Sequence, residues 1–182
     1  MYAPHFAAAL AVKSRAPEAP VWALFLGAFL PDLAWIVLAR IGVEPTAERI
    51  FYDGWSHSLV CVLIMASVFA AAFWKRGRAV VVAIWIAVFS HFMLDFPVHP
   101  QRLLLCPGLD VRLGWNLLSW GTAPGWLGAI NDWWLQAVTL LPLLAIYVWG
   151  MRRTSMPMSL IAASCVILLG AQLLMLSSAI SY

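Results

Sequence analysis

Long apolar stretches separated by short polar segments constrain this chain more than any other feature. Five of them reach or approach the roughly 20 mostly apolar residues that a helix needs to cross a bilayer. They are residues 21–41, 56–74, 79–96, 133–150 and 157–180. With 64% hydrophobic and only 10% charged residues, the chain lacks the polar surface that a water-soluble domain needs. The sequence therefore predicts an all-α, polytopic membrane protein with about five transmembrane helices.

The remaining segments complete this outline. Residues 1–12 are apolar but too few to span, so we expect a short interfacial or re-entrant helix there. Residues 101–132 are rich in Pro, Gly and Trp and are predicted to form an outward loop. We therefore interpret residues 1–182 as one membrane-embedded domain. In it, 1–100 carries the polar chemistry and 133–182 serves as scaffold.

Basic residues gather at alternate ends of the predicted spans. Seven of the 11 Lys and Arg residues flank one set of ends: Lys13, Arg15, Lys75, Arg76, Arg78, Arg152 and Arg153. Positive charge marks the cytoplasmic side of short loops, so we expect a multi-pass inner (plasma) membrane protein with a cytoplasmic N-terminus and an outward C-terminus. The basic residues form no continuous stripe, which argues against a nucleic-acid partner. Membrane lipids are the expected partners, and the oligomeric state is left open.

Ionisable residues at membrane depth are confined to the first half of the chain. Asp32, His91 and Asp95 fall inside predicted spans, and His57 stands at the edge of another. A charged group inside a bilayer costs about 2.5 kcal/mol or more unless it pairs, faces a cavity or binds an ion. The two spans after residue 132 contain no Asp, Glu, His, Lys or Arg. The polar chemistry therefore belongs to one half of the bundle.

The spacing of these residues favours a shared metal ion. His91 and Asp95 are four residues apart, so a helix presents both on one face, where they can hold one divalent cation. Asp32 follows Pro31, and a proline removes a backbone hydrogen bond and can open the helix beside a polar cavity. Ser56, just before His57, is a predicted N-cap of the next helix.

Each residue also has a purely structural interpretation. His57 could be a capped histidine at the membrane interface. His91 and Asp95 could bond only to each other, and Asp32 could pair with Arg40 two turns further along. One metal site accounts for all of these residues together, whereas the structural interpretation needs a separate reason for each. We therefore prefer the metal site.

Together these motifs resemble an inner-membrane family assigned as LexA-binding, metal-dependent hydrolases. That family has an N-terminal His, a Pro-Asp-x-Asp in its first long helix, a His-Arg-Gly-x-Thr-His-Ser motif opening the next, and a Ser-His-x-x-x-Asp in the third. The matches here, over about residues 1–100, are His5, Pro31-Asp32, Gly54-x-Ser56-His57-Ser58 and Ser90-His91-x-x-x-Asp95. The family in turn looks distantly similar to zinc-dependent phospholipase C and P1 nuclease.

Two positions depart from the family pattern. Ala34 replaces the second Asp of Pro-Asp-x-Asp, and Tyr52-Asp53 replaces the His-Arg before the glycine. Two candidate ligands are therefore missing. A centre that holds two or three metal ions in the family is reduced to one here, or Asp53 substitutes.

The resemblance implies a membrane-embedded hydrolase of a phosphoester or related bond in a lipid or lipid-linked substrate. The implied metal ligands are His5, Asp32, His57, His91 and Asp95. Zn²⁺ is the expected ion, with Mn²⁺ or Fe as alternatives. Asp53 or Asp32 would act as general base, and Arg49, Arg102 and His99 would bind substrate. The alternative functions are an ion- or proton-coupled transporter and a noncatalytic membrane subunit with a structural metal site.

Overall fold

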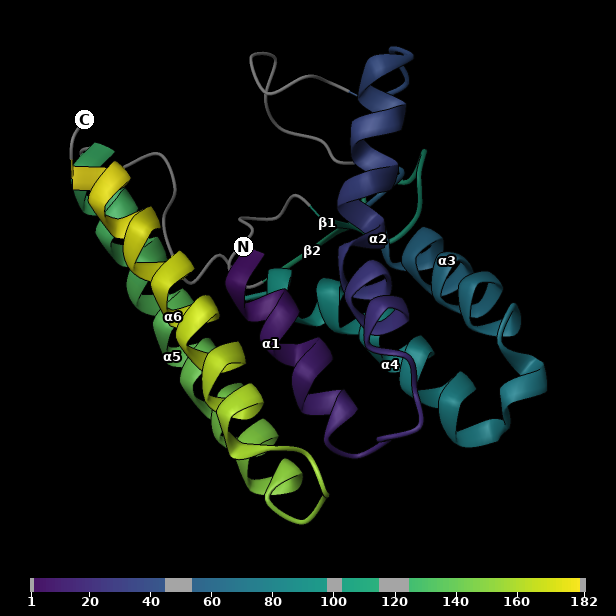
Figure 1. Ribbon diagram of the computed structural model, residues 1–182. Coiled ribbons are helices and arrows are strands. Elements are labelled where there is room, and N and C mark those ends of the chain that lie inside the picture. Colours follow the sequence, from purple (N-terminus) through teal and green to yellow (C-terminus); the bar gives the residue numbers. More distant parts are fainter. Residues whose placement is uncertain (1, 45–53, 98–102, 115–124, 181–182) are drawn as a thin grey trace.

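The computed structural model of the chain describes residues 2–44, 54–97, 103–114 and 125–180. Within these ranges it contains six α-helices, a single 3-10 turn and one two-stranded hairpin (Figure 1). The helices are α1 (Tyr2–Lys13), α2 (Val21–Arg40), α3 (Leu59–Ala71), η2 (Trp74–Arg76), α4 (Arg78–Asp95), α5 (Gly125–Met151) and α6 (Met158–Ile180). The strands β1 (Leu103–Leu104) and β2 (Arg112–Leu113) pair antiparallel. The predicted all-α class is confirmed.

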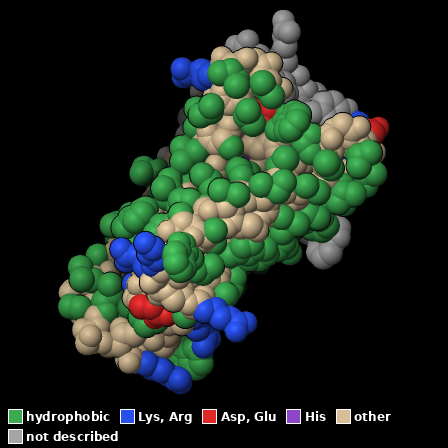
Figure 2. Space-filling view, turned by 90° about the vertical axis from the view of Figure 1, so that its right-hand side faces the viewer, with side chains coloured by type: hydrophobic (Ala, Val, Ile, Leu, Met, Phe, Trp, Pro, Cys, Tyr) green, Lys and Arg blue, Asp and Glu red, His purple; other side chains and the backbone are tan. Residues whose placement is uncertain are grey.

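Within the described residues, three helical segments are long and apolar enough to cross a membrane: α2, α4 and Trp134–Met151 of α5. Helix α3 and the segment Met158–Leu174 of α6 are apolar but shorter, so the predicted count of five spans is not confirmed. Hydrophobic side chains cover most of the face seen in Figure 2. Every long helix from α2 to α6 exposes large apolar residues, for example Val37, Val68, Val82, Val138 and Val166. Such a surface suits contact with lipid, and the chain is a membrane protein.

Helix α1 is buried inside the bundle and does not lie along its surface. Ala3, Ala7 and Leu10 pack with Leu140 and Leu144 of α5 in one apolar cluster. The other side of α1 faces α2 and α4, so among the described residues α1 is the main link between the α2–α4 group and the α5–α6 pair. Its many small alanines let neighbouring backbones approach closely. The chain then turns and returns as α2 (Figure 1), and a re-entrant course of α1 in the membrane stays a prediction.

Most of the described basic residues lie at one end of the bundle, with Arg40 and Arg112 as exceptions. The α1–α2, α3–α4 and α5–α6 turns all lie at the lower end in Figure 1. Lys13 closes the first of them by donating hydrogen bonds to the carbonyls of Pro17 and Ala19. The guanidinium groups of Arg15 and Arg153 lie over the Trp149 ring, 5.1 Å and 4.6 Å from its centroid. Since α1 begins at the end opposite Lys13, the positive-inside argument applies to this turn, and the side of the N-terminus stays a prediction.

Three local expectations differ from the structure. Helix α2 stays α-helical through Pro31, because the surrounding packing holds the turn that lacks one hydrogen bond. Helix α5 begins at Gly125, so its first turns take up the end of the predicted 101–132 loop. The hairpin lies at the start of that loop and packs on α3 and α4, with Leu103 buried in a cluster with Val62 and Phe92.

Candidate metal centre

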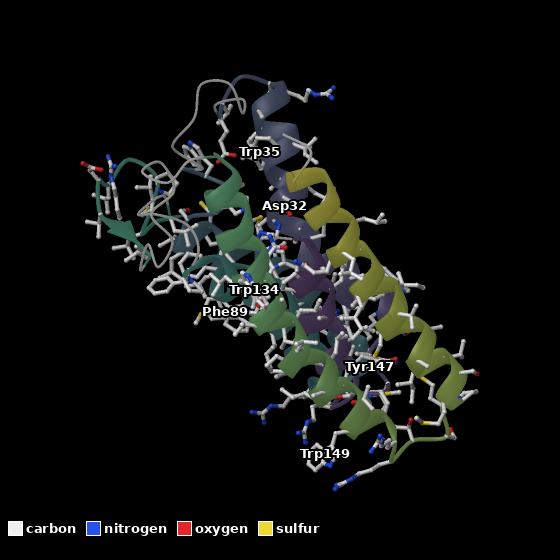
Figure 3. All side chains as sticks on the ribbon, turned by 90° about the vertical axis from the view of Figure 1, so that its left-hand side faces the viewer. Asp32, Trp35, Phe89, Trp134, Tyr147 and Trp149 are labelled. Atoms are coloured by element: carbon white, nitrogen blue, oxygen red, sulfur yellow. The ribbon has the colours of Figure 1, made fainter. Side chains whose placement is uncertain are left out.

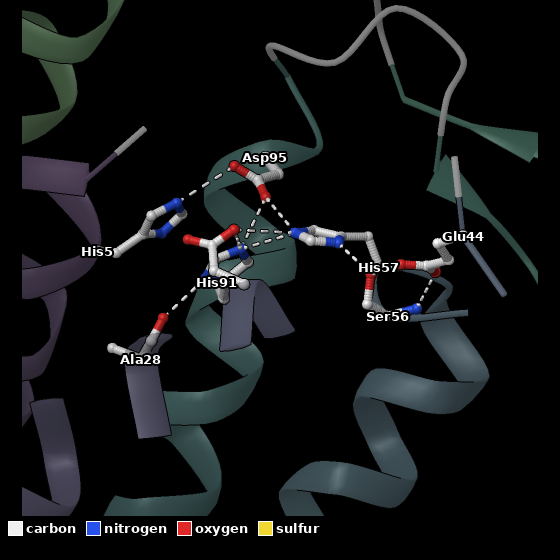
Figure 4. Close-up of polar contacts among 8 residues, drawn as sticks. His5, Ala28, Glu44, Ser56, His57, His91 and Asp95 are labelled. Carbon is white, nitrogen blue, oxygen red and sulfur yellow. Dashed lines mark hydrogen bonds and ion pairs between the residues drawn. The ribbon is translucent and has the colours of Figure 1, made fainter. Parts of the chain in front are cut away.

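All five predicted ligands converge on one place between α1, α2 and α4 (Figure 4). His5 comes from the first turns of α1, and His91 and Asp95 come from the last turns of α4. Asp32 lies within α2, and His57 precedes the start of α3. Four of the side chains are 1–6% exposed, whereas Asp32 is 21% exposed. The cluster is therefore closed on most sides and opens at Asp32, well away from the basic end marked by Trp149 (Figure 3).

Ring nitrogens and carboxylate oxygens face each other at the centre of this cluster. The Nε2 atoms of His57 and His91 are 3.2 Å apart. Asp32 Oδ1 lies 3.4 Å from His57 Nε2 and 3.7 Å from His91 Nε2. Asp95 Oδ2 lies 3.1 Å from His91 Nε2 and 3.9 Å from His57 Nε2. Asp32 thus contacts the histidines, and the structural alternative of a pair with Arg40 does not describe it.

The other ring nitrogen of each histidine fixes which atom carries the proton. His91 Nδ1 lies 2.7 Å from the Ala28 carbonyl, which can only accept a hydrogen bond, so Nδ1 is the protonated nitrogen. His57 Nδ1 lies 2.8 Å from Ser56 Oγ, and that hydroxyl donates its own proton to Glu44 at 2.8 Å. Ser56 can therefore only accept from His57. Each imidazole, when it is neutral, therefore carries its lone pair on Nε2, as metal-ligating histidines require.

This arrangement places electron pairs against electron pairs. Two imidazole lone pairs face each other, and the acceptor oxygens of Asp32 and Asp95 lie beside them. Such a set repels itself in a buried site unless a cation or an extra proton lies among its members. The donor set, imidazole with carboxylate, is the one that zinc and related divalent ions take in proteins.

The distances fit one ion among Asp32, His57 and His91. Ligands that share a tetrahedral zinc at about 2.0–2.1 Å are about 3.4 Å apart. The three atoms of this group are separated by 3.2, 3.4 and 3.7 Å. His91 also belongs to a second group of possible ligands, with His5 and Asp95. Because its Nδ1 is engaged by Ala28, His91 has only one ligand atom to give, so it can complete one group at a time.

His5 lies in the cluster in a different way. Its ring stacks on His91, with centroids 3.9 Å apart and planes 6° from parallel. A metal ion binds in the plane of an imidazole ring, so two stacked rings cannot both direct lone pairs at one ion. His5 Nε2 lies 3.3 Å from Asp95 Oδ1, the carboxylate oxygen turned away from His91. Burial, reinforced by His91, lowers the pKa of His5 to about 4, which leaves this imidazole neutral at physiological pH.

Two residues of the site were not predicted in their observed role. Glu44 is buried and accepts hydrogen bonds from Trp55 N at 2.6 Å, Ser56 N at 2.7 Å and the Ser56 hydroxyl. Ser56 was predicted as an N-cap, but Ser58 caps α3 by accepting from Cys61 N. Ser56 instead connects Glu44 with His57. Glu44 and Ser56 have no periodic relation in the sequence, so no motif could have paired them.

Four predicted site residues lie outside the described residues. They are the second candidate base and the three candidate substrate-binding residues: Asp53, Arg49, Arg102 and His99. Their assignments stay predictions. Asp32, the other candidate base, is the most exposed acid of the cluster and faces two histidines.

Comparison with known proteins yields one family. A family model described as YdjM inner membrane protein matches residues 2–178, nearly the whole chain. This match agrees with the inner-membrane part of the expected resemblance. No curated protein and no solved structure matches the chain. The expected likeness to zinc-dependent phospholipase C and P1 nuclease therefore has no support from these comparisons.

Proposed function

The chain belongs to the YdjM inner membrane protein family, and from that premise we propose that it is a membrane-embedded, metal-dependent hydrolase. One observation carries the proposal. Two buried imidazoles, each with its Nδ1 proton fixed by a neighbour, turn their Nε2 lone pairs toward each other at 3.2 Å beside two carboxylates. A bound cation requires this orientation, and without a cation only an extra proton shared with the carboxylates would offset the repulsion between the lone pairs.

We assign His57, His91 and Asp32 as the principal ligands, with Asp95 beside them and His5 behind Asp95. A divalent cation held there, most simply Zn²⁺, would lower the pKa of bound water toward 7 and polarise a phosphoryl or acyl oxygen. Asp32 combines ligand distance with exposure, so its second oxygen can take the proton of an attacking water. Asp95, closed in by His5 and His91, serves to hold the imidazoles in place.

The substrate class follows from where the cluster opens. Asp32 is the exposed member, and Ile36 and Val37, one turn further along α2, are 41% and 58% exposed. A polar site beside an apolar, lipid-facing helix surface suits a molecule with a charged head and an apolar tail. We therefore propose a phosphoester or related bond of a lipid or lipid-linked substrate. The site lies toward the end of the bundle opposite the basic turns, which the positive-inside rule assigns to the cytoplasm.

Metal content is the first test. Detergent-purified protein is analysed by elemental mass spectrometry as wild type, as the double variant His91→Ala, Asp95→Ala, and as Cys165→Ser. Cys165, on α6 and away from the cluster, is the control for adventitious binding by a thiol. We expect about one equivalent of zinc or manganese in wild type and control and none in the double variant. Wild type without metal would overturn the proposal.

Activity then separates the hydrolase from the two alternatives. Phospholipid and lipid-phosphate substrates in mixed micelles should be cleaved by wild type and not by His91→Ala. Metal binding with ion flux in liposomes but no hydrolysis would favour a transporter, although the unbroken α2 removes one argument for that function. Metal binding with neither activity would favour a structural metal site.

A further inference from the structure

The end of α2 and the start of α3 meet through a buried chain of polar groups. Gly42, at φ +78°, ends α2 in a left-handed turn in which Val43 N bonds to Leu38 O at 2.9 Å. This turn redirects the chain, and Glu44, only 4% exposed, faces the segment before α3. Its Oε1 accepts from the backbone N–H groups of Trp55 and Ser56, and its Oε2 accepts from the Ser56 hydroxyl (Figure 4).

We propose that Glu44 and Ser56 form a positioning relay that sets the tautomer of His57 and so presents its Nε2 as a metal ligand. The relay rests on the proposed metal centre for its purpose but not for its geometry. The hydroxyl of Ser56 has one proton. Because Glu44 takes that proton at 2.8 Å, Ser56 must accept from His57 Nδ1, also at 2.8 Å, and the lone pair of His57 is left on Nε2.

Two backbone donors fix the orientation of the Glu44 carboxylate and therefore the direction of the hydrogen bonds in this relay. The N–H groups of Trp55 and Ser56 both lie within 2.7 Å of Glu44 Oε1, so an oxygen must occupy that position. Glu44→Gln keeps the size of the side chain and keeps an oxygen there, which turns its NH₂ group toward Ser56. The hydroxyl then accepts from Gln, which frees its own proton to be donated to His57 Nδ1. His57 changes to the tautomer with its proton on Nε2, and that proton faces His91 and excludes a cation.

Ring-nitrogen NMR reads this inversion directly. Protein labelled with ¹⁵N-histidine is studied in detergent, free of metal and at mildly alkaline pH, where imidazoles are neutral. His57→Gln assigns the resonance among the four histidines of the chain. We expect a protonated Nδ1 in wild type and a protonated Nε2 in Glu44→Gln. The same tautomer in both proteins overturns the relay.

Zinc titration measures the consequence. Affinity should fall at least 100-fold in Glu44→Gln and about tenfold in Ser56→Ala, the range known for partners that support metal-binding histidines. In Ser56→Ala no hydroxyl remains to invert, so the double variant Glu44→Gln, Ser56→Ala should bind like Ser56→Ala and better than Glu44→Gln alone. A merely structural role for Glu44 predicts the opposite order, and that result would contradict the relay.

Ser58→Ala is the matched control. Ser58 lies two residues from Ser56 and caps α3, so its loss lowers stability without touching His57 Nδ1. We expect unchanged tautomers and zinc affinity within about threefold of wild type. If the tautomer inverts in Glu44→Gln but wild type binds no zinc, the relay stands and the proposed metal centre falls. If zinc binds and the tautomer does not invert, the metal centre stands and the relay falls.

Discussion

The α1–α4 part of the bundle and the α5–α6 pair are both apolar outside, but they differ inside. The first part buries three histidines, Asp95 and Glu44, whereas the described interior of the α5–α6 pair buries neutral polar groups, Gln136 and Gln172. Each of these buried ionisable side chains has a polar partner in another segment. The comparison teaches that the first part is arranged around the polar cluster, whereas the second is packed through apolar contacts, and that α1 contacts both parts.

The largest effect should come from a ligand at the centre of the cluster. His91→Ala removes the one nitrogen that lies near Asp32, His57 and Asp95 together. Zinc affinity, measured by competition with a chelating dye, should fall by more than about 10³-fold, or roughly 4 kcal/mol. The control variant Leu144→Ala, on α5, should leave zinc affinity unchanged. If His91→Ala retains affinity within a few-fold of wild type, the contrast between the two parts is lost.

A variant in the α5–α6 pair, Leu144→Ala, tests the part of the bundle that is held by apolar packing. Leu144 is 5% exposed and lies in the cluster shared by α1, α5 and α6. Leu144→Ala should lower the free energy of unfolding by about 3 kcal/mol, because it removes buried contacts and leaves a cavity. Reversible unfolding in mixed micelles measures this loss. Full zinc stoichiometry in the folded variant is the expected control result, and loss of zinc would mean that the scaffold also shapes the site.

The sequence pointed to the His and Asp residues that the structure brings together, but not to the contacts that connect them. The free-energy cost of placing an ionisable side chain at membrane depth pointed to Asp32, His57, His91 and Asp95, because each needs a partner or a bound ion there. The role of Glu44 could not be foreseen, because the turn at Gly42 decides which way it faces. The burial of α1 was equally hidden. The length of α1 is too short for a membrane span, but only its packing against α5 shows that this short apolar helix lies inside the bundle.

Substitutions at two glycines, Gly150 and Gly170, test how much the close contact between α1 and α5 contributes to stability. A Cβ at Gly150 would come within 2.6 Å of the Ser14 side chain, whereas one at Gly170 on α6 would meet nothing within 4 Å. Gly150→Ala should therefore push α1 away and lower the free energy of unfolding by about 2 kcal/mol. Gly170→Ala should be neutral or slightly stabilising, because alanine favours helix. Equal effects of the two variants would show that the close approach of α1 to α5 does not matter.

The smallest effect should come from His5, the residue of the site carried by α1. If His5 supports Asp95 and is not a ligand, His5→Ala should weaken zinc binding about tenfold, roughly 1.4 kcal/mol, and far less than His91→Ala. His5→Phe keeps the ring that stacks on His91 and should lose less than His5→Ala.

The pH dependence of zinc binding tests whether His5 is neutral in the site, while the size of the affinity loss separates a supporting role from a ligand role. Burial lowers the pKa of His5 to about 4, so above about pH 5 this imidazole has no proton to release when zinc binds. Above about pH 5, zinc affinity should therefore depend on pH in the same way in wild type and in His5→Ala. A loss as large as that of His91→Ala would make His5 a ligand, and α1 would then contribute to the metal site directly.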